Sequence, residues 1–206
     1  MDSKTSHGTQ QSGPLLFDVP QPGDLDEIFA IANHPRTWAH IPGERVTDPE
    51  QVTATLAMFG RGWQEHGLSH WVVRLGSAGT YPGLLPGQVL GTGGVHLFKT
   101  GAGPNIWNLG YRLDPDGWGH GFATHLARRA ITKAGETRTE VPVIARVLST
   151  NPASARVATK VGLRLLWTGE TSQKTRAAVG LGSVQRLIFA DRTLEPEVLE
   201  WLISRG

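Results

Sequence analysis

Residues 108–124, NLGYRLDPDGWGHGFAT, are the stretch on which the interpretation of the whole chain depends. They predict a short apolar strand, a polar turn and the start of an amphipathic helix. Glycines at alternate positions, Gly117, Gly119 and Gly121, leave the backbone free of Cβ atoms where strand becomes helix. The first turn of a helix has unpaired N–H groups at the positive end of its dipole, so the loop predicts a site for a phosphate or pyrophosphate.

Two familiar nucleotide-binding loops are excluded by residue identity. A Walker loop needs a lysine after its last glycine, but Phe122 follows Gly121. A dinucleotide fingerprint that starts at Gly119 would need its third glycine at Thr124, and one that starts at Gly117 would need it at Phe122.

Residues 116–121, DGWGHG, lie between a predicted strand and a predicted helix and resemble motif A of the GNAT acyltransferases, whose loop has the form Q/R-x-x-G-x-G/A. The first position differs here, and the variant DPxxWGxGxAT resembles the branch of ribosomal-protein N-terminal acetyltransferases. A second segment, STNPASARV at 149–157 followed by KVGL at 160–163, is similar to the same branch. The two motifs occur in the expected order, and the resemblance covers about residues 15–190.

The chain pattern predicts one α/β (α+β) domain over residues 14–206, preceded by a flexible tail over 1–13 that has no apolar residue after Met1. The resemblance implies a GNAT fold, with a mixed central sheet of about seven strands and helices on both faces. Strands are predicted over 15–19, 69–75, 88–97, 106–113, 143–148, 163–168 and 184–190. Helices are predicted over 24–32, 49–67, 121–134, 152–162 and 194–203, whereas 169–182 is read as a polar connection.

Composition excludes several classes of protein. Lys and Arg total 20 against 18 Asp and Glu, and they form no run, so no nucleic-acid partner is expected. The chain has no cysteine, which excludes disulfides, thiolate metal sites and a cysteine-bound intermediate. No apolar stretch has the length of a membrane span, so we expect no membrane association and a cytoplasmic protein. A metal is not expected either.

The resemblance implies acetyl-CoA as cofactor, with its pyrophosphate on the amides of residues 118–122. Asn151 is predicted to cap a helix, a role that needs no ligand, and by resemblance it also reaches the pantetheine arm. Ser154 lies by resemblance near the cofactor sulfur, where it would stabilise or protonate the thiolate. Arg156 and Lys160 are candidates for the CoA phosphates. The predicted cofactor-binding residues are Tyr111, Arg112, Leu113, Trp118, Gly119, His120, Gly121, Phe122, Ala123, Asn151 and Ser154.

The inferred reaction is direct attack of an amine on the thioester in a ternary complex. The resemblance places a carbonyl-polarising backbone N–H near Tyr111 and Arg112. His96 is the first choice for the base, with Glu170, His40 or a water as alternatives. The predicted catalytic residues are therefore Ser154, His96 and Tyr111.

The resemblance implies that the loop over residues 33–47 walls the acceptor pocket, so Trp38, His40 and Arg45 are candidates to touch the acceptor. Glu170 is a further candidate. Trp38 has a second interpretation, as a cover for the edge of the core. The acceptor amine itself stays open between a protein N-terminus and a small molecule.

Two other functions are compatible with the same motifs: a non-catalytic, CoA-binding regulatory module and an unrelated phosphate-binding α/β protein. A homodimer that forms through a sheet edge at 184–190 or through the C-terminal helix also stays open.

Overall fold

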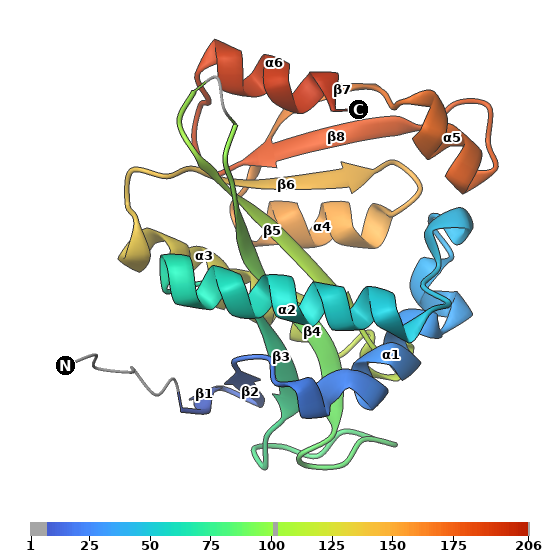
Figure 1. Ribbon diagram of the computed structural model, residues 1–206, viewed down its shortest axis with the longest axis vertical. Helices are drawn as coiled ribbons and strands as arrows, with labels where there is room; N and C mark the ends of the chain where they lie inside the picture. The colour runs from blue at the N-terminus through green and yellow to red at the C-terminus, as the bar shows by residue number, and fades with distance from the viewer. Residues whose placement is uncertain (1–7, 101–102, 206) are drawn as a thin grey trace.

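The computed structural model describes residues 8–100 and 103–205, which form one eight-stranded sheet with helices on both faces (Figure 1). The strand order is β1-β2-β3-β4-β5-β6-β8-β7. Strands β5 and β6 are parallel, and the other neighbours are antiparallel. The strands are β1 (Gln10–Ser12), β2 (Leu15–Asp18), β3 (His70–Leu75), β4 (Val89–Phe98), β5 (Ile106–Leu113), β6 (Val143–Leu148), β7 (Arg164–Glu170) and β8 (Gln185–Ala190).

Six α-helices accompany these strands in the described residues, and four short 3₁₀ helices connect them. The α-helices are α1 (Leu25–Asn33), α2 (Pro49–His66), α3 (Phe122–Thr137), α4 (Pro152–Lys160), α5 (Gln173–Val179) and α6 (Pro196–Ser204). The 3₁₀ helices are η1 (Pro22–Asp24), η2 (Pro35–Trp38), η3 (Pro42–Glu44) and η4 (Pro115–Gly117).

The ends of α2 follow directly from the local sequence. The Asp48 carboxylate accepts the backbone N–H of Glu50 at 2.9 Å, and Pro49 occupies the first helical position, where no N–H is needed. Gly67 ends the helix in the left-handed region, with φ of 70°. The predicted apolar stripe is buried as expected: Val52, Leu56, Phe59 and Trp63.

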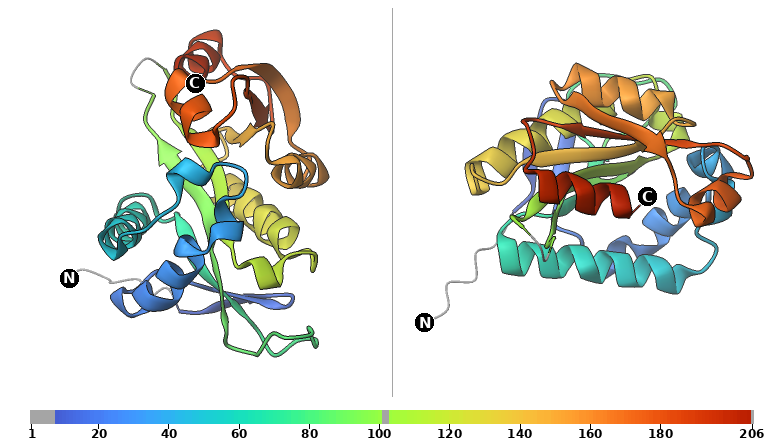
Figure 2. Two further views of the ribbon diagram at one scale, coloured as in Figure 1. Left: turned by 90° about the vertical axis from the view of Figure 1, so that its right-hand side faces the viewer. Right: turned by 90° about the horizontal axis from the view of Figure 1, so that it is seen from above.

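The helices form two layers around the sheet (Figure 2). Helices α1, α2 and α6 lie on one side, and α3 and α4 lie on the other. The side chains of β5 alternate between the two faces of the sheet and so contribute to both hydrophobic cores. Trp107 and Leu109 pack in the core that contains α3, whereas Ile106 packs in the core that contains α6. The face of β5 that carries each side chain is therefore known, and this decides which residues of the site can meet.

Helix α3 lies close against the centre of the sheet because small residues face each other there. Its buried stripe contains Ala127, Ala130 and Ala134. A Cβ at Gly93 of β4 would lie 2.7 Å from both the Leu126 side chain and the Cβ of Tyr111. A larger residue at Gly93 would push α3 away from the strand that carries Tyr111.

Three sequence predictions need correction. The sequence predicts that Gln10–Ser12 belong to a flexible tail, but these residues form β1, which pairs with β2. Residues 1–7 of the predicted tail lie outside the described part. The connection over 169–182 contains α5, which Ser172 caps. Strand β8 lies between β6 and β7, so residues 184–190 are not a sheet edge and β7 takes that place. The described residues contain no helix long and apolar enough to cross a bilayer.

The partly buried His70 of β3 makes stability dependent on pH. Its ring stacks on Phe59 with centroids 4.3 Å apart. Burial, and then the nearby His96, lowers the pKa of His70 from 6.5 to about 3. Between these two values the unfolded chain binds a proton that the folded chain does not, so stability falls as pH falls through this window.

We expect His70→Gln to remove this dependence. Between about pH 7 and pH 5 the wild-type free energy of unfolding should fall by about 2 kcal/mol more than that of the variant, measured by urea unfolding. The exposed His34 supplies the control, His34→Gln, which should follow the wild type. Parallel pH profiles for His70→Gln and the wild type would contradict the assignment.

Candidate active site

The parallel ladder between β5 and β6 is short, and the sheet opens where it ends. Only three pairs join the strands, from Trp107 opposite Val143 to Leu109 opposite Ala145. Strand β5 nevertheless continues to Leu113, and its remaining residues pair with β4 alone. The β6 side of β5 therefore carries unused backbone groups at its carboxyl end.

The direction of these backbone groups follows from the hydrogen bonds on either side. Trp107 donates its N–H to Pro142 O at 2.9 Å, toward β6, whereas Asp114 donates to Leu90 O at 2.8 Å, toward β4. Because successive residues of a strand alternate, the N–H groups of Tyr111 and Leu113 point into the gap. The N–H of Arg112 points toward β4. Of the two residues predicted to supply a carbonyl-polarising N–H, Tyr111 has the suitable direction.

Side chains bridge the gap between β5 and α4. The Tyr111 hydroxyl lies 2.9 Å from Ser154 Oγ. Burial raises the pKa of Tyr111, and the hydrogen bond to Ser154 opposes that shift, so the phenol stays protonated at neutral pH. Asn151 Oδ1 accepts the backbone N–H of Ser154 at 3.0 Å, which confirms the predicted helix cap. The hydroxyl pair thus lies at the N-terminus of α4, beside the gap.

The glycine loop brings the N-terminus of α3 to the same end of β5. Gly119 and Gly121 have φ of 84° and 81°, a region that disfavours other residues, and a Cβ at either would have no protein atom within 4 Å. No side chain caps α3, so the N–H groups of Phe122 and Ala123 remain open in its first turn. The Trp118 indole N–H donates to Leu113 O at 3.1 Å, which fixes the loop against β5.

A hollow of about 570 Å³ lies in front of this first turn. Its cationic lining residues are Arg128 and Lys160, and His120 and His125 add two imidazoles. Lys160 was predicted from the sequence, whereas Arg156 is exposed and does not line this hollow. Open helix N–H groups beside basic side chains form an anion site, so the donor set fits a pyrophosphate-bearing cofactor.

The segment between α1 and α2 covers the other side of the gap. Trp38 of η2 is buried, at 8% exposure, and donates its indole N–H to Ala32 O. The Arg112 guanidinium lies 3.4 Å from the centre of the Trp38 ring, and burial lowers the pKa of Arg112 to about 10. Trp38 therefore acts here as a platform for Arg112 at the edge of the core.

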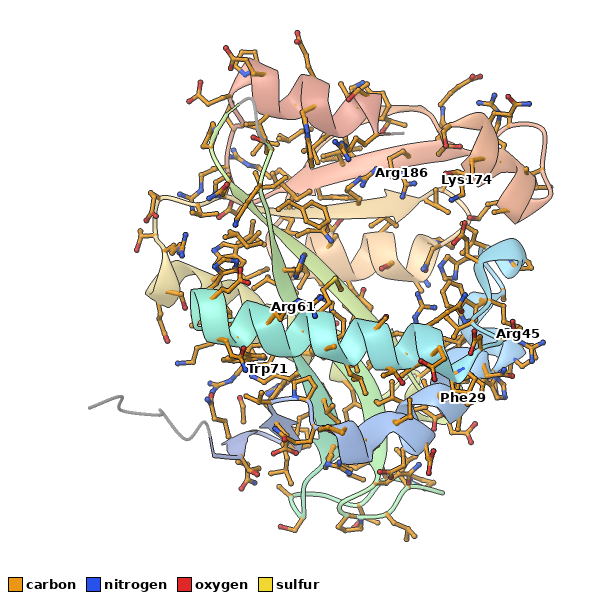
Figure 3. The ribbon with its side chains drawn as sticks, in the orientation of Figure 1. Phe29, Arg45, Arg61, Trp71, Lys174 and Arg186 are labelled. Carbon is orange, nitrogen blue, oxygen red and sulfur yellow. The ribbon has the colours of Figure 1, made fainter. Side chains whose placement is uncertain are left out.

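His40 follows Trp38 and contacts the turn before α4. Its carbonyl oxygen accepts the Thr150 hydroxyl at 2.8 Å. Burial first, and then the charge of Arg112, lowers the pKa of the His40 imidazole. Arg45, which Figure 3 shows at the edge of the molecule, donates to the carbonyl of Asn33 at 2.6 Å and so holds the end of α1.

Glu170 ends β7 beside α5. Its carboxylate lies 3.6 Å from the Arg176 guanidinium and is 75% exposed. Helix α5 meets η3 closely, since a Cβ at Gly43 would lie 2.8 Å from the backbone of Ala178. Glu170 and His40 thus belong to neighbouring segments at the carboxyl end of β5 and β6.

The structure does not bring His96 to the hydroxyl pair. His96 pairs with Asn108 across the β4–β5 ladder, and that register places both side chains on the face of α2, opposite to Tyr111. Burial, and then His66, lowers the pKa of His96, so its imidazole is neutral at neutral pH.

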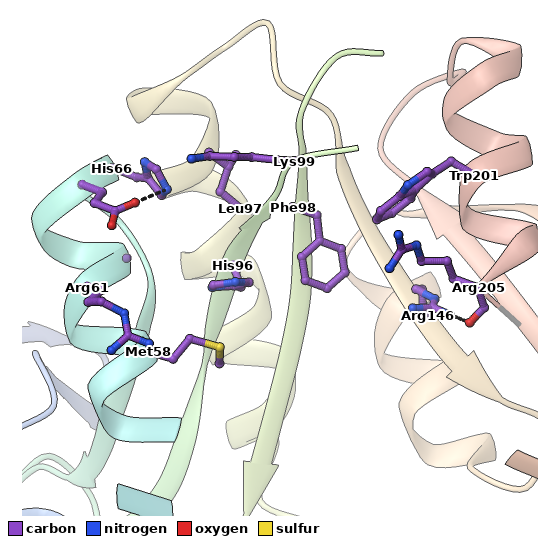
Figure 4. A pocket seen from close by; sticks show the side chains of 12 residues that line it. Met58, Arg61, His66, His96, Leu97, Phe98, Lys99, Arg146, Trp201 and Arg205 are labelled. Carbon is purple, nitrogen blue, oxygen red and sulfur yellow. Dashed lines mark hydrogen bonds and ion pairs between the residues drawn. The ribbon is translucent and has the colours of Figure 1, made fainter. Parts of the chain in front are cut away.

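His96 lines a cavity of about 490 Å³ between α2 and α6 (Figure 4). Four cationic side chains line the same cavity: Arg61, Lys99, Arg146 and Arg205. No sequence pattern groups these four residues, because they come from four separate segments and belong to no motif.

Comparison with known proteins agrees with this architecture. A family model described as an acetyltransferase (GNAT) domain matches residues 15–164. The chain belongs to the GNAT acetyltransferase family, as the resemblance of its two motifs predicted. A search of curated proteins gave no significant match.

Several solved structures share the fold. The ribosomal-protein-S5-alanine acetyltransferase from Vibrio fischeri is 14% identical, with a TM-score of 0.68 over 92% of this chain and 100% of that chain. The Salmonella typhimurium acetyltransferase that modifies the N-terminal serine of L7/L12 is 13% identical, with a TM-score of 0.64 over 89% and 97%. The microcin C7 self-immunity acetyltransferase MccE, in complex with acetyl-CoA and AMP, is 12% identical, with a TM-score of 0.66 over 89% and 94%.

The glycine loop yields a test of the anion site. Gly121→Ala places a methyl group in the open space before the first turn of α3 and should weaken CoA binding at least about tenfold in calorimetry. Gly67→Ala is the matched control, because Gly67 has a similar positive φ and open surroundings at the far end of α2. Both variants should lose similar thermal stability, about 1–2 kcal/mol. Equal CoA affinity in the two variants would place the phosphate elsewhere.

Proposed function

We propose that the protein is an acetyl-CoA-dependent N-acetyltransferase that acetylates a primary amine, of a protein N-terminus or a small molecule, by direct attack in a ternary complex. The observation that carries the proposal is the gap between β5 and β6. The Tyr111 N–H, the hydroxyl pair of Tyr111 and Ser154, and the N-termini of α3 and α4 all meet at this gap. Membership of the GNAT family and the acetyl-CoA complex of MccE support the choice of cofactor.

The residues that would hold acetyl-CoA come from both sides of the gap. The open N–H groups from Gly119 to Ala123 would bind the pyrophosphate, with Arg128 and Lys160 beside them. The N–H groups of Tyr111 and Leu113 point into the gap and could donate to an extended chain placed along β5, as they would to a neighbouring strand.

A small number of groups would carry out the steps of the acetyl transfer. Bound acetyl-CoA supplies an acetyl thioester, so the reaction forms one N–C bond, breaks one C–S bond and moves one proton from the amine to the departing sulfur. The Tyr111 N–H would donate to the carbonyl oxygen as negative charge develops on it. Ser154, held by Asn151 and hydrogen-bonded to Tyr111, would donate to the sulfur.

We assign the base to His96, with His40 as the second candidate. Both imidazoles have lowered pKa values, so both are neutral near pH 7 and able to accept the proton of an ammonium group. His96 lies on the face of the sheet opposite to Ser154, which would place the arriving amine and the leaving sulfur on opposite sides of the carbonyl. Glu170 is less suited, because it is exposed and paired with Arg176.

Binding and turnover together test this function. Calorimetric titration should show binding of acetyl-CoA and desulfo-CoA but not of ATP, and thiol release should follow when amines are added. Binding without release for every amine would favour the regulatory module. Binding of ATP in competition with CoA would favour an unrelated phosphate-binding protein.

The hydroxyl pair gives a sharper prediction for the mechanism. Ser154→Ala and Tyr111→Phe should each lower kcat about 10- to 100-fold, and the double variant should be no slower than the slower single variant, because the two hydroxyls act as one unit.

Thr159→Ala is the control for the hydroxyl pair, since it removes an exposed hydroxyl from the same helix. It should leave kcat unchanged in the thiol-release assay. If the Michaelis constant for acetyl-CoA rises in Ser154→Ala while kcat is retained, Ser154 is a binding residue or a cap rather than a proton donor.

A further inference from the structure

We propose that the cavity between α2 and α6 selects an acceptor that is a small primary amine carrying a carboxylate or a phosphate. This inference rests on the function proposed above and adds the chemical class of the acceptor. The cavity has a volume of about 490 Å³, within the range of small-molecule sites. Its walls come from α2, β4, β6 and α6 (Figure 4).

The cavity begins where the β5–β6 ladder ends. Ala145 is the last residue of β6 that pairs with β5, and Arg146 is the next residue. Ala145 packs in the core under α3, so alternation directs Arg146 to the opposite face, into the cavity. Through Arg146 the cavity adjoins the gap, and a molecule in it would approach the gap from the face opposite to α3 and α4.

Positive charge dominates the lining. In the described residues, no ion pair joins Arg61, Arg146 or Arg205 to a carboxylate. The acidic residue of the lining is Glu65, which is more than half exposed and lies 3.6 Å from His66. Grouped cations raise the local concentration of anions and repel cations, so polyamines and other dications are disfavoured as acceptors.

The geometry of the arginines favours a planar or multidentate anion. Arg146 donates through Nη2 to the carbonyl of Arg205 at 2.8 Å, but its Nε is buried without a hydrogen-bond partner. Arg205 lies 4.6 Å from the Trp201 ring, which orients its guanidinium.

A second arginine of the sheet, besides Arg146, adds to the positive electrostatic potential near the cavity. Arg186 of β8 (Figure 3) faces the same side, and burial, then the charge of Arg146, lowers its pKa to about 10. Clustered guanidinium groups of this kind are stabilised by an anion that accepts several N–H bonds, as a carboxylate or phosphate does.

Two further buried atoms suit the amine. His96 Nδ1 and Asn108 Oδ1 are both buried without a hydrogen-bond partner, and their residues form a cross-strand pair. An amine has N–H groups for both, with His96 in the tautomer that carries its proton on Nε2. The amine end would then lie beside the proposed base, next to the last pairs of the β5–β6 ladder, and the anionic end would lie among the arginines.

The test compares matched amines in the thiol-release assay with saturating acetyl-CoA. The pairs are O-phosphoethanolamine with ethanolamine, and glycine with glycinamide; putrescine supplies the dication, and an acidic tripeptide with its neutral analogue supplies the peptide. We expect kcat/KM for at least one small anionic amine to exceed that of its neutral partner at least about tenfold, with putrescine the poorest acceptor.

Variants then assign the preference to the cavity. Arg61→Gln should reduce the ratio between O-phosphoethanolamine and ethanolamine about tenfold, and Arg61→Lys should restore part of it, because the charge returns without the planar fork. Arg61 is exposed on α2, so its replacement should not disturb folding. The control is Arg164→Gln, which removes an exposed arginine of β7 outside the cavity and should leave the ratio unchanged.

The outcomes separate this inference from the proposed function. Three results, each obtained with a protein that binds acetyl-CoA, would overturn the inference and leave the cofactor assignment standing. The first is a preference for neutral or cationic amines, and the second is acetylation of the acidic tripeptide alone. The third is the absence of both turnover and calorimetric binding for every small anionic amine. An unchanged ratio in Arg61→Gln would also overturn it. Failure to bind acetyl-CoA would instead overturn the proposed function.

Discussion

The early end of the β5–β6 ladder is the constraint on which the site depends. A parallel pair normally continues as long as both strands do, because each unpaired backbone group must find another partner. Here β5 keeps its full ladder with β4 but only three pairs with β6. The tightly packed side, with Gly93 against Tyr111 and Leu126, holds β5 in place. The open side is left with directed donors that the protein itself does not use.

The N-termini of two helices, α3 and α4, lie at this opening in the sheet. Helix α3 follows β5 after η4 and the glycine loop, and α4 follows β6 after a short turn, so both N-termini lie at the carboxyl ends of the parallel pair. The loop before α3 is held from the opposite side of the gap as well, because Arg36 of η2 lies 3.5 Å from Asp116 and 5.6 Å from the Trp118 ring. The α1–α2 segment and the glycine loop are thus coupled through exposed contacts, each of modest strength.

Local signals in the sequence predicted most of the fold. Strand β5 and helix α2 have the predicted bounds within one residue, since caps, glycines and apolar periodicity all mark them. Strand β1 and helix α5 were not predicted. Strand β1 consists of three polar residues that are ordered by pairing with β2, and α5 is a short helix that packs on η3. Tertiary contacts, and not local sequence signals, therefore determine both elements.

The candidate site divides in the same way. Asn151, Ser154 and Tyr111 belong to motifs, and the structure brings them together. The prediction of His96 as the base rests on strand adjacency alone, and the register places His96 on the other face, away from Tyr111. Arg61 and Arg146 are 85 positions apart and share no pattern, so only the folded sheet makes them neighbours of one cavity.

Strand β1 has a consequence for how the chain can be handled. Ser12 Oγ lies 3.0 Å from His125 Nε2, and the Gln10 side chain accepts from Arg129 at 2.6 Å, so the first strand is fastened to α3. Pro14, just after it, lines the hollow before that helix together with His125. Trimming the chain back to its second strand would therefore bare the edge of the sheet and remove one wall of the hollow. A protease cut or an affinity tag is better tolerated ahead of residue 10 than inside this segment.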